Sequence, residues 1–149
     1  MPLIRGRLGL VAVPLLLLAI DPVAAADCNL SDEAQAGKKV AQQCLTCHEF
    51  KANQPSGKLA PNIHDVFGAS MGTRKDYRAY SPAMQGATQK GLKWTEDGLI
   101  EYLKSPSDYL AKINGRELPH GMFYQLRDSQ ARHDVVAFLK AIKGHPECN

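Results

Sequence analysis

Apolar residues recur at helical spacing in the second half of this 149-residue chain. Thr95 is a favourable helix N-cap, and three aliphatic residues follow it at helical spacing before Pro106 would end the helix: Leu99, Ile100 and Leu103. A second helix is predicted over residues 129–144, where four aliphatic residues share one face: Val135, Val136, Leu139 and Ile142. Residues 107–127 lie between these patterns and are predicted to form a loop.

The first half of the chain is more polar. Ser31 is a good N-cap with Asp32 and Glu33 in the turn after it, so a helix is predicted from here into Cys44. Residues 50–92 are rich in Gly, Pro, Ser and Asn, which predicts loops with one short helix at 81–85. Because strand patterns are nearly absent, we expect an all-α fold with long connecting loops.

The N-terminal residues have the layout of an export signal. Arg5 and Arg7 precede an apolar run at 8–20, and three small residues follow at 24–26. We therefore predict a cleaved signal peptide at 1–26, a single domain at 27–149 and a periplasmic location. The run is shorter than the roughly 20 residues that span a bilayer, so an uncleaved anchor is the weaker alternative.

The net charge of the chain and the size of its domain limit the functions that we expect. The formal charge is +3, and removing Arg5, Arg7 and Asp21 with the signal would leave +2. No basic cluster exceeds the pair Lys38 and Lys39, so nucleic-acid binding is not expected. A small domain with a loop-rich middle has little apolar area to offset its chain entropy, and a large planar apolar cofactor would fill its interior.

Cys44, Cys47 and His48 form a Cys-x-x-Cys-His motif, which is the signature of covalent c-type haem attachment. Thiols three positions apart on a helical turn project from one side and can form thioethers with two vinyl groups, while the imidazole reaches the iron. Zinc would need four ligands, but Cys28 and Cys148 are isolated at the two ends. A dithiol redox site would be expected in a βαβ setting. Both are weaker alternatives to one haem c.

A haem iron held by His48 needs a sixth ligand or an open site, and this decides between carrier and enzyme. Met122 lies in a polar loop and is the predicted ligand. Met71 and Met84 are more simply gap-filling or exposed side chains, and His120 is a solvated loop residue. With both axial positions taken, we predict one-electron transfer and no enzyme activity. The alternative is a haem enzyme or sensor with an exchangeable sixth ligand.

Five segments together resemble class I cytochromes c, in particular the mitochondrial-like and c2 branch: "GKKVAQQCLTCHEF", "LAPNIHDVFG", "YSPAM", "GLKWTEDGLIEYLKSPSDY" and "DVVAFLKAIK". The resemblance covers roughly residues 37–143. It implies a small cytochrome c fold in which the terminal helices cross, with Gly37 at the crossing, and long loops wrap around one covalent haem.

The resemblance also implies roles for single residues. Pro61 would accept a hydrogen bond from the ring of His48. Tyr80 and Trp94 would each reach a haem propionate, and Tyr102 would lie beside the sulfur of Met122.

The chain departs from the family pattern at several positions. Ala41 replaces an aromatic residue, so the packing against Phe138 must be filled otherwise. About seven extra residues, within "AKINGREL", precede Met122, and Met84 replaces an asparagine. The arginine that neutralises a propionate has two candidates, Arg74 and Arg78. Several docking lysines are replaced, at Gln43, Ser107, Asp108 and Gly121, whereas Lys58 and Arg127 are retained.

The helix crossing that the resemblance implies would bring the two tails together, so we predict a disulfide between Cys28 and Cys148. The resemblance implies redox proteins as partners, namely a cytochrome bc1-type donor, an oxidase, a reaction centre or a dehydrogenase. We expect a monomer with peripheral membrane contact at most, and weak salt dependence of its reactions because the lysine ring is thinned.

Overall fold

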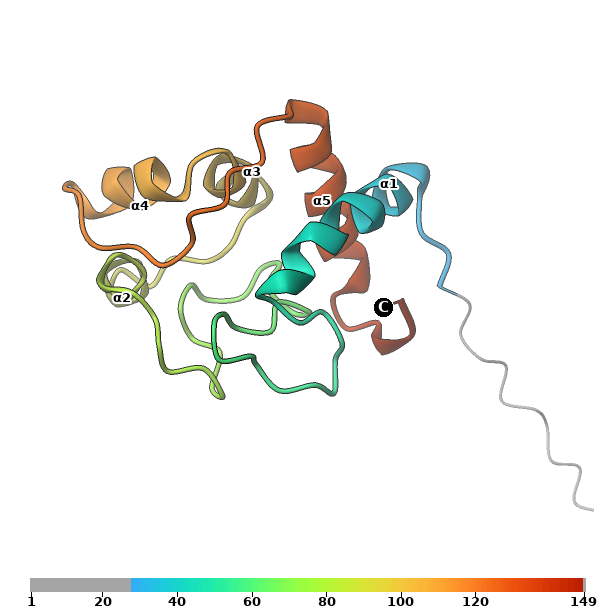
Figure 1. Ribbon diagram of the computed structural model, residues 1–149, viewed down its shortest axis with the longest axis horizontal. Helices are drawn as coiled ribbons and strands as arrows, with labels where there is room; N and C mark the ends of the chain where they lie inside the picture. The colour runs from blue at the N-terminus through green and yellow to red at the C-terminus, as the bar shows by residue number, and fades with distance from the viewer. Residues whose placement is uncertain (1–27, 149) are drawn as a thin grey trace, which may run out of the picture.

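The computed structural model describes residues 28–148, so the predicted signal peptide at 1–26 lies outside the described residues. Its helices, in chain order, are α1 Asp32–Ala41, η1 Gln42–Thr46, α2 Pro82–Gln89, α3 Glu96–Lys104, α4 Pro106–Asn114, α5 Ser129–Ile142 and η2 Pro146–Cys148 (Figure 1). In this part of the chain the only β pairing is an isolated bridge between Ser70 and Lys93. The predicted all-α fold with long loops is confirmed.

Side-chain caps fix where the helices begin. The hydroxyl of Ser31 accepts a hydrogen bond from the Ala34 N–H at 3.2 Å, and that of Thr95 accepts one from the Gly98 N–H at 3.1 Å. Ser81 caps α2, which runs four residues beyond the predicted end at Gln85. Within residues 28–148, no helix combines the length and apolar character needed to cross a bilayer.

The prediction of a loop over residues 107–127 is wrong in its first part, because α4 occupies Pro106–Asn114. Pro106 ends α3 and also takes the first position of α4, where its missing N–H costs nothing. The Ser105 hydroxyl caps the new helix, and Gly115 ends it with a φ of 72°. The first four residues of "AKINGREL" are therefore the last turn of a helix.

The terminal helices α1 and α5 cross closely, as Figure 1 shows. A Cβ atom on Gly37 would collide with the backbone carbonyl of Asp134, so only glycine permits this approach. Phe50 makes up for the small side chain of Ala41. Its ring centroid lies 5.7 Å from that of Phe138. The predicted apolar face of α5 is buried in full.

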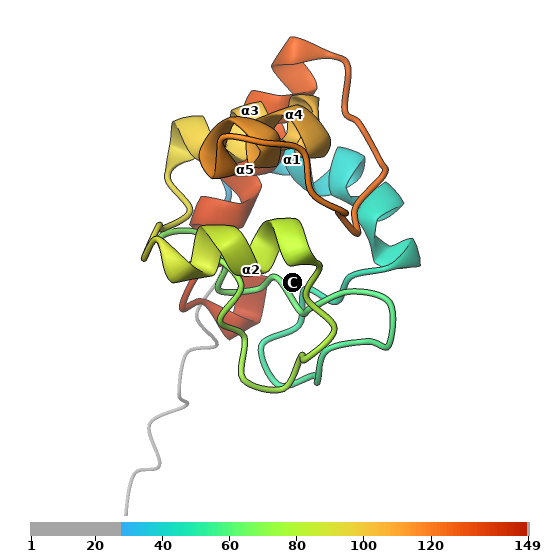
Figure 2. The ribbon, with the colours of Figure 1, turned by 90° about the vertical axis from the view of Figure 1, so that its left-hand side faces the viewer.

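The loops between α1 and α3 fold back onto the helices. Gly68 and Trp94 are joined by a hydrogen bond from the Gly68 N–H to the Trp94 carbonyl, at 2.8 Å. The Met71 N–H donates to the Leu92 carbonyl at 2.8 Å, and the Met71 side chain is fully buried. In Figure 2 these loops and α2 lie below α3 and α4, and the space that holds the site is lined by the loops, α2 and α3 among other elements.

Candidate functional site

A cavity of about 1120 Å³ lies among the loops and helices. All the residues predicted to hold the cofactor or its iron line it: Cys44, Cys47, His48, Pro61, Tyr80, Trp94, Tyr102 and Met122. Apolar side chains from several elements complete the walls, among them Phe50, Val66, Leu99 and Leu139. The fold thus brings residues that are up to 78 positions apart in sequence to one site.

Cys44 lies within η1, a 3₁₀ turn that replaces the predicted continuation of α1, and Cys47 follows the end of this turn. Both cysteines line the cavity, so their side chains reach the same site. The turn is closed by hydrogen bonds from the N–H groups of Cys47 and His48 to the Cys44 carbonyl, at 3.1 and 2.8 Å. Burial, and then the neighbouring Cys47, raise the pKa of the Cys44 thiol.

His48 is oriented by the loop that follows the motif. Its Nδ1 lies 2.8 Å from the Pro61 carbonyl oxygen, which can only accept, so Nδ1 carries the proton and Nε2 keeps its lone pair. Burial lowers the pKa of His48, and the hydrogen bond to Pro61 opposes this in part. A neutral imidazole with a fixed tautomer is the form that binds metals.

Met122 lies on the segment between α4 and α5, which hydrogen bonds hold at both ends. The Ala83 N–H donates to the Pro119 carbonyl at 3.0 Å, and the Leu126 N–H donates to the Leu103 carbonyl at 2.8 Å. His120 is not among the cavity-lining residues, and its Nδ1 lies 3.1 Å from the Met122 carbonyl oxygen. The backbone around Met122 is therefore fixed by contacts with α2 and α3.

Met84 also lines the cavity, on α2, which sequence reasoning did not predict. Met71, by contrast, fills a gap in the core as expected and does not line the cavity. The signal for Met84 was present, because it replaces a polar residue of the family in the segment that precedes Trp94.

Two aromatic side chains, Trp94 and Tyr102, form part of the cavity wall, and Tyr109 packs against them without lining the cavity. Trp94 and Tyr102 meet edge to face with ring centroids 4.8 Å apart, and Tyr109 stacks on Trp94 at 6.2 Å. Burial alone raises the pKa of Tyr102, whose hydroxyl has no hydrogen-bond partner among residues 28–148. The Tyr80 hydroxyl accepts a hydrogen bond from the Arg74 N–H at 3.1 Å and still has its own proton to donate.

The role of Asn62 in the loop after the motif was missed from the sequence. The buried Asn62 amide donates to the carbonyls of Lys51 and Gln54, both at 2.8 Å, and its Oδ1 accepts from the His64 N–H. These bonds close the loop that presents Pro61 to His48. An asparagine bonding to the backbone two residues on is a common turn device, and this was the available signal.

Arg74 lines the cavity, whereas the other candidate, Arg78, does not. The Arg74 Nε lies 2.9 Å from Asp76 Oδ1. Asp76 also accepts hydrogen bonds from the N–H and the hydroxyl of Ser56. The hydrogen bond from the Ser56 N–H, and to a smaller extent Arg74, lower the pKa of Asp76 to about 2.

This donor set fits a haem attached through two thioethers. Two thiols and one imidazole lone pair come from a single turn, and a thioether comes from a separate segment of the wall. The remaining walls are mostly apolar, with a small number of free donors such as the Tyr102 hydroxyl. A large planar apolar group with two acidic groups on one edge would satisfy these walls.

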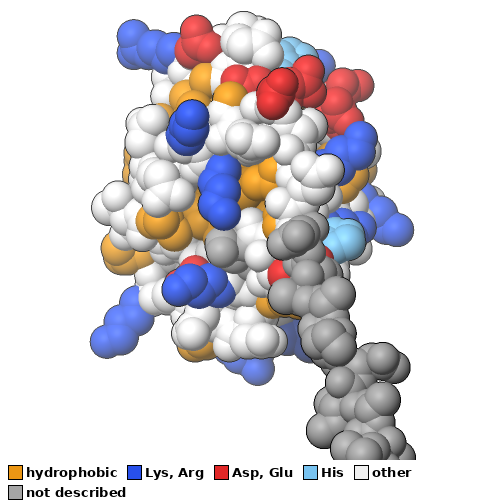
Figure 3. Space-filling view, turned by 90° about the vertical axis from the view of Figure 1, so that its right-hand side faces the viewer, with side chains coloured by type: hydrophobic (Ala, Val, Ile, Leu, Met, Phe, Trp, Pro, Cys, Tyr) orange, Lys and Arg blue, Asp and Glu red, His pale blue; other side chains and the backbone are white. Residues whose placement is uncertain are grey.

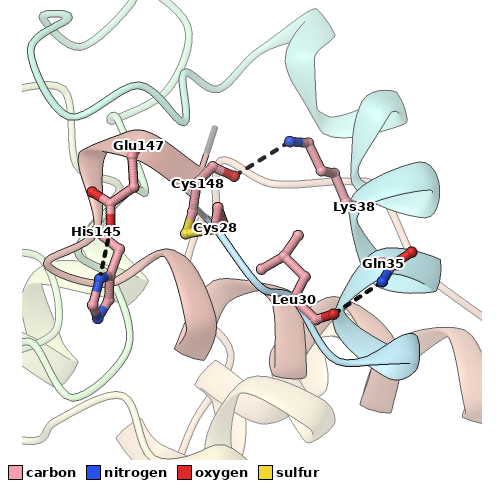
Figure 4. The surroundings of a disulfide bond; sticks show 7 residues. All are labelled: Cys28, Leu30, Gln35, Lys38, His145, Glu147 and Cys148. Atoms are coloured by element: carbon pink, nitrogen blue, oxygen red, sulfur yellow. Dashed lines mark hydrogen bonds and ion pairs between the residues drawn. A yellow bond between two sulfur atoms is a disulfide. The ribbon is translucent and has the colours of Figure 1, made fainter. Parts of the chain in front are cut away.

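Cys28 and Cys148 meet where the two tails lie together, and Figure 4 shows the bond between their sulfur atoms. Their Cα atoms are 4.9 Å apart although 120 positions separate them in sequence. The Lys38 ammonium donates to the Cys148 carbonyl at 3.3 Å, which ties α1 to the same tail. The geometry is compatible with the predicted disulfide.

Comparison with known proteins gives consistent matches. The family model described as "Cytochrome c" matches residues 34–143. The cytochrome c2 of Rhodopseudomonas palustris is 34% identical over 140 residues, covering 85% of this chain and 97% of that protein. The cytochrome c2 of Afifella marina is 37% identical over 109 residues, covering 73% and 82%.

The fold matches solved structures in the same way. The structure of cytochrome c2 from Rhodobacter sphaeroides superposes with a TM-score of 0.67 at 29% identity, covering 72% of this chain and 93% of that one. That of the cytochrome c2 from Paracoccus denitrificans gives 0.67 at 29% identity, covering 74% and 96%. These likenesses confirm the fold predicted from the sequence.

Proposed function

The chain belongs to the cytochrome c family, in its c2 branch, and carries electrons on one covalently bound haem c, and we propose which of its residues hold the haem and its iron. Cys44 and Cys47 would hold the haem through two thioethers, and His48 and Met122 would bind its iron. The main support is that His48, fixed by its 2.8 Å contact with the Pro61 carbonyl, shares one cavity with both thiols and the Met122 side chain.

When bound, the haem supplies a reversible one-electron change at its iron. The Pro61 carbonyl holds the His48 ring in one orientation and raises its basicity as a ligand. Met122 contributes a neutral sulfur, which favours the reduced state, and the apolar walls act in the same direction by excluding water. A reduction potential on the high side for haem proteins follows from these three features.

We propose roles for the free hydrogen-bond donors of the cavity toward the propionate edge of the haem. Trp94 and Tyr80 donate to the propionates, and Arg74 is the cation that offsets their charge. The Tyr102 hydroxyl, which has no other partner among residues 28–148, donates toward the Met122 sulfur. Each of these groups lines the cavity, and that shared position supports the assignment.

We also propose that the protein is exported to the periplasm, where it works as a monomer and exchanges electrons with larger redox proteins. The export pattern at residues 1–26 supports the location. A bc1-type complex as donor, and an oxidase, a reaction centre or a dehydrogenase as the other partner, fit a small exported carrier. Contacts of this kind are small and transient.

The disulfide between Cys28 and Cys148 is part of the proposal. It would close a loop of about 120 residues and restrict the unfolded chain, which stabilises the fold by several kcal/mol on the chain-entropy model. Thiol titration of the denatured, unreduced holoprotein should find no free cysteine, because the other two carry haem. Two reactive thiols would rule the bond out.

The ligand set is tested by visible spectra of the protein matured with haem, comparing wild type, Met122→Leu and Met84→Leu. The weak red iron–sulfur band of the oxidised form should disappear only in Met122→Leu. The matched control keeps it, because Met84 lines the cavity without binding iron. A band that survives in Met122→Leu would disprove the assignment, and rapid carbon monoxide binding by reduced wild type would favour the enzyme or sensor alternative.

A further inference from the structure

Asn114, the last residue of α4, is followed by Gly115, and this pair is chemically reactive. The backbone nitrogen of a glycine can attack the side-chain amide carbon of the residue before it, because glycine has no side chain to hinder the approach. Among the asparagines of the sequence, only Asn114 precedes a glycine. The Gly115 N–H has no hydrogen-bond acceptor among residues 28–148, and Gly115 is exposed with nothing within 4 Å of a Cβ placed on it. The attacking group is therefore free.

The side chain of Asn114, by contrast, is held away from this nitrogen. Its amide nitrogen donates to the Ala83 carbonyl of α2 at 3.0 Å and to the Leu110 carbonyl, one turn earlier in α4, at 2.8 Å. A Cβ atom on Gly86 would collide with Asn114 Oδ1, so the amide lies directly against α2. These contacts direct the side chain toward the preceding turn, whereas Gly115 follows it in the chain. The packing of α4 against α2 thus blocks the reaction.

We propose that Asn114 is a site of spontaneous deamidation whose rate is set by how often α4 separates from α2. In this reaction the Gly115 nitrogen bonds to the Asn114 Cγ and the Cγ–Nδ2 bond breaks. The proton lost by the Gly115 nitrogen leaves with the amide group as ammonia. Water then opens the cyclic imide at either of its carbonyls, which leaves an aspartate or an isoaspartate. The rate rises with pH, because the Gly115 nitrogen attacks after it has lost its proton.

The product cannot restore the contact with α2. A carboxylate only accepts hydrogen bonds, so it would face the carbonyl oxygens of Ala83 and Leu110 with no donor between them. The Ala83 N–H donates to the Pro119 carbonyl at 3.0 Å, three positions before Met122. Loss of the α2 contact therefore loosens one end of the segment that carries the proposed iron ligand, and this consequence rests on the proposed function.

The added negative charge acts through these local contacts rather than across the molecule. The helices α2 and α4 lie on the side that faces the viewer in Figure 2. Figure 3 shows the opposite side, where Lys and Arg side chains are scattered and acidic side chains gather at the upper edge. Solvent and salt screen the repulsion between those acidic groups and a carboxylate at position 114. We therefore expect the effect to be confined to α2, α4 and the Met122 segment, with the crossing of α1 and α5 intact.

The test follows deamidation of the folded holoprotein at mildly alkaline pH, by mass spectrometry of the peptides released by cleavage after lysine. Residues 113–140 form one such peptide, in which Asn114 is the only asparagine. Residues 52–58 form another, which contains the exposed Asn53 followed by Gln54 and serves as an internal control. The mass shift of an amide converted to an acid gives the rate at each asparagine.

Gly86→Ala should raise the rate at Asn114 about tenfold, because its Cβ displaces the Asn114 side chain and the reaction follows the population of the open form. The helix α2 itself gains a better helix former. Gly121→Ala is the matched control, since its Cβ comes no closer than 3.8 Å to its neighbour, and its rate should stay within about twofold of wild type. Should Gly86→Ala fail to mature, wild type in denaturant below its unfolding transition should show the same rise.

Equal rates at Asn114 in Gly86→Ala and Gly121→Ala would overturn the proposal, as would an equal rise at Asn53, which would indicate global unfolding. Deamidated wild type carries one more negative charge, so ion exchange separates it from the unmodified protein. Its iron–sulfur band should be lost at a lower denaturant concentration, and unchanged loss of the band would contradict the loosening of the Met122 segment. A wild type without the band would disprove the proposed function alone, because the mass measurement does not depend on an iron ligand.

Discussion

The crossing of α1 and α5 and the region formed by α2, α4 and the Met122 segment are held together in different ways. At the crossing, backbones meet at Gly37 and the Phe50 and Phe138 rings pack in the core. In the α2–α4 region individual hydrogen bonds hold short elements: the Asn114 amide donates to the Ala83 carbonyl of α2 and to the Leu110 carbonyl of its own helix. We expect the first region to determine global stability and the second to position one proposed ligand.

Gly37→Ala should have the largest effect, because its Cβ would meet the Asp134 carbonyl, which belongs to rigid helical backbone. We expect a loss of about 3 kcal/mol in the unfolding free energy of the holoprotein, at the upper end for overpacking. Chemical denaturation followed by far-ultraviolet circular dichroism measures this. Gly121→Ala is the control, since its Cβ would come no closer than 3.8 Å to its neighbour. Similar stabilities for the two variants would contradict the close crossing.

Asn114→Ala should weaken the other region by removing two hydrogen bonds, at 3.0 and 2.8 Å, for a cost of about 1–2 kcal/mol. The red iron–sulfur band should then be lost at a lower denaturant concentration than the helical signal. In Gly37→Ala the two signals should move together. Asn53→Ala, an exposed position, should leave both unchanged. Coincident loss of both signals in Asn114→Ala would mean that the two regions unfold as one unit.

Asp76→Asn should have the smallest effect, confined to low pH. Because its folded pKa of about 2 lies below the ordinary value of 3.8, the carboxylate stabilises the fold above about pH 4 and loses that contribution as the pH falls toward 2. The variant should therefore show a flatter fall of thermal stability between pH 4 and 2. Glu117→Gln, at an exposed position, should keep the wild-type slope. If Asp76→Asn kept the wild-type slope, this carboxylate would not contribute to acid unfolding.

The site was predictable from the sequence wherever the chemistry depends on near neighbours. The Cys44 and Cys47 spacing needs only a turn, and the caps at Ser31 and Thr95 act within three residues. Pro106 shows the limit of such rules, because the same residue can end one helix and begin the next. Its second role depended on the Ser105 cap, which the sequence also contained.

The packing of α4 against α2 could not be predicted from the sequence. The extra residues before Met122 looked like a loop at the edge of the site, but Asn114 instead places them against α2, close to the backbone of Gly86. This contact joins residues 31 positions apart and has no local signature.

The amino-acid sequence by itself determined the attachment motif, most of the helices and the one haem that the loop-rich chain needs, because spacing and capping act through neighbours along the backbone. Only the tertiary structure decided which side chains face the cavity. It placed Pro61 against His48, brought Met84 into the wall and left Phe123 exposed at the rim. These outcomes depend on packing between segments distant in sequence, where many weak contacts compete and no single residue pattern specifies the result.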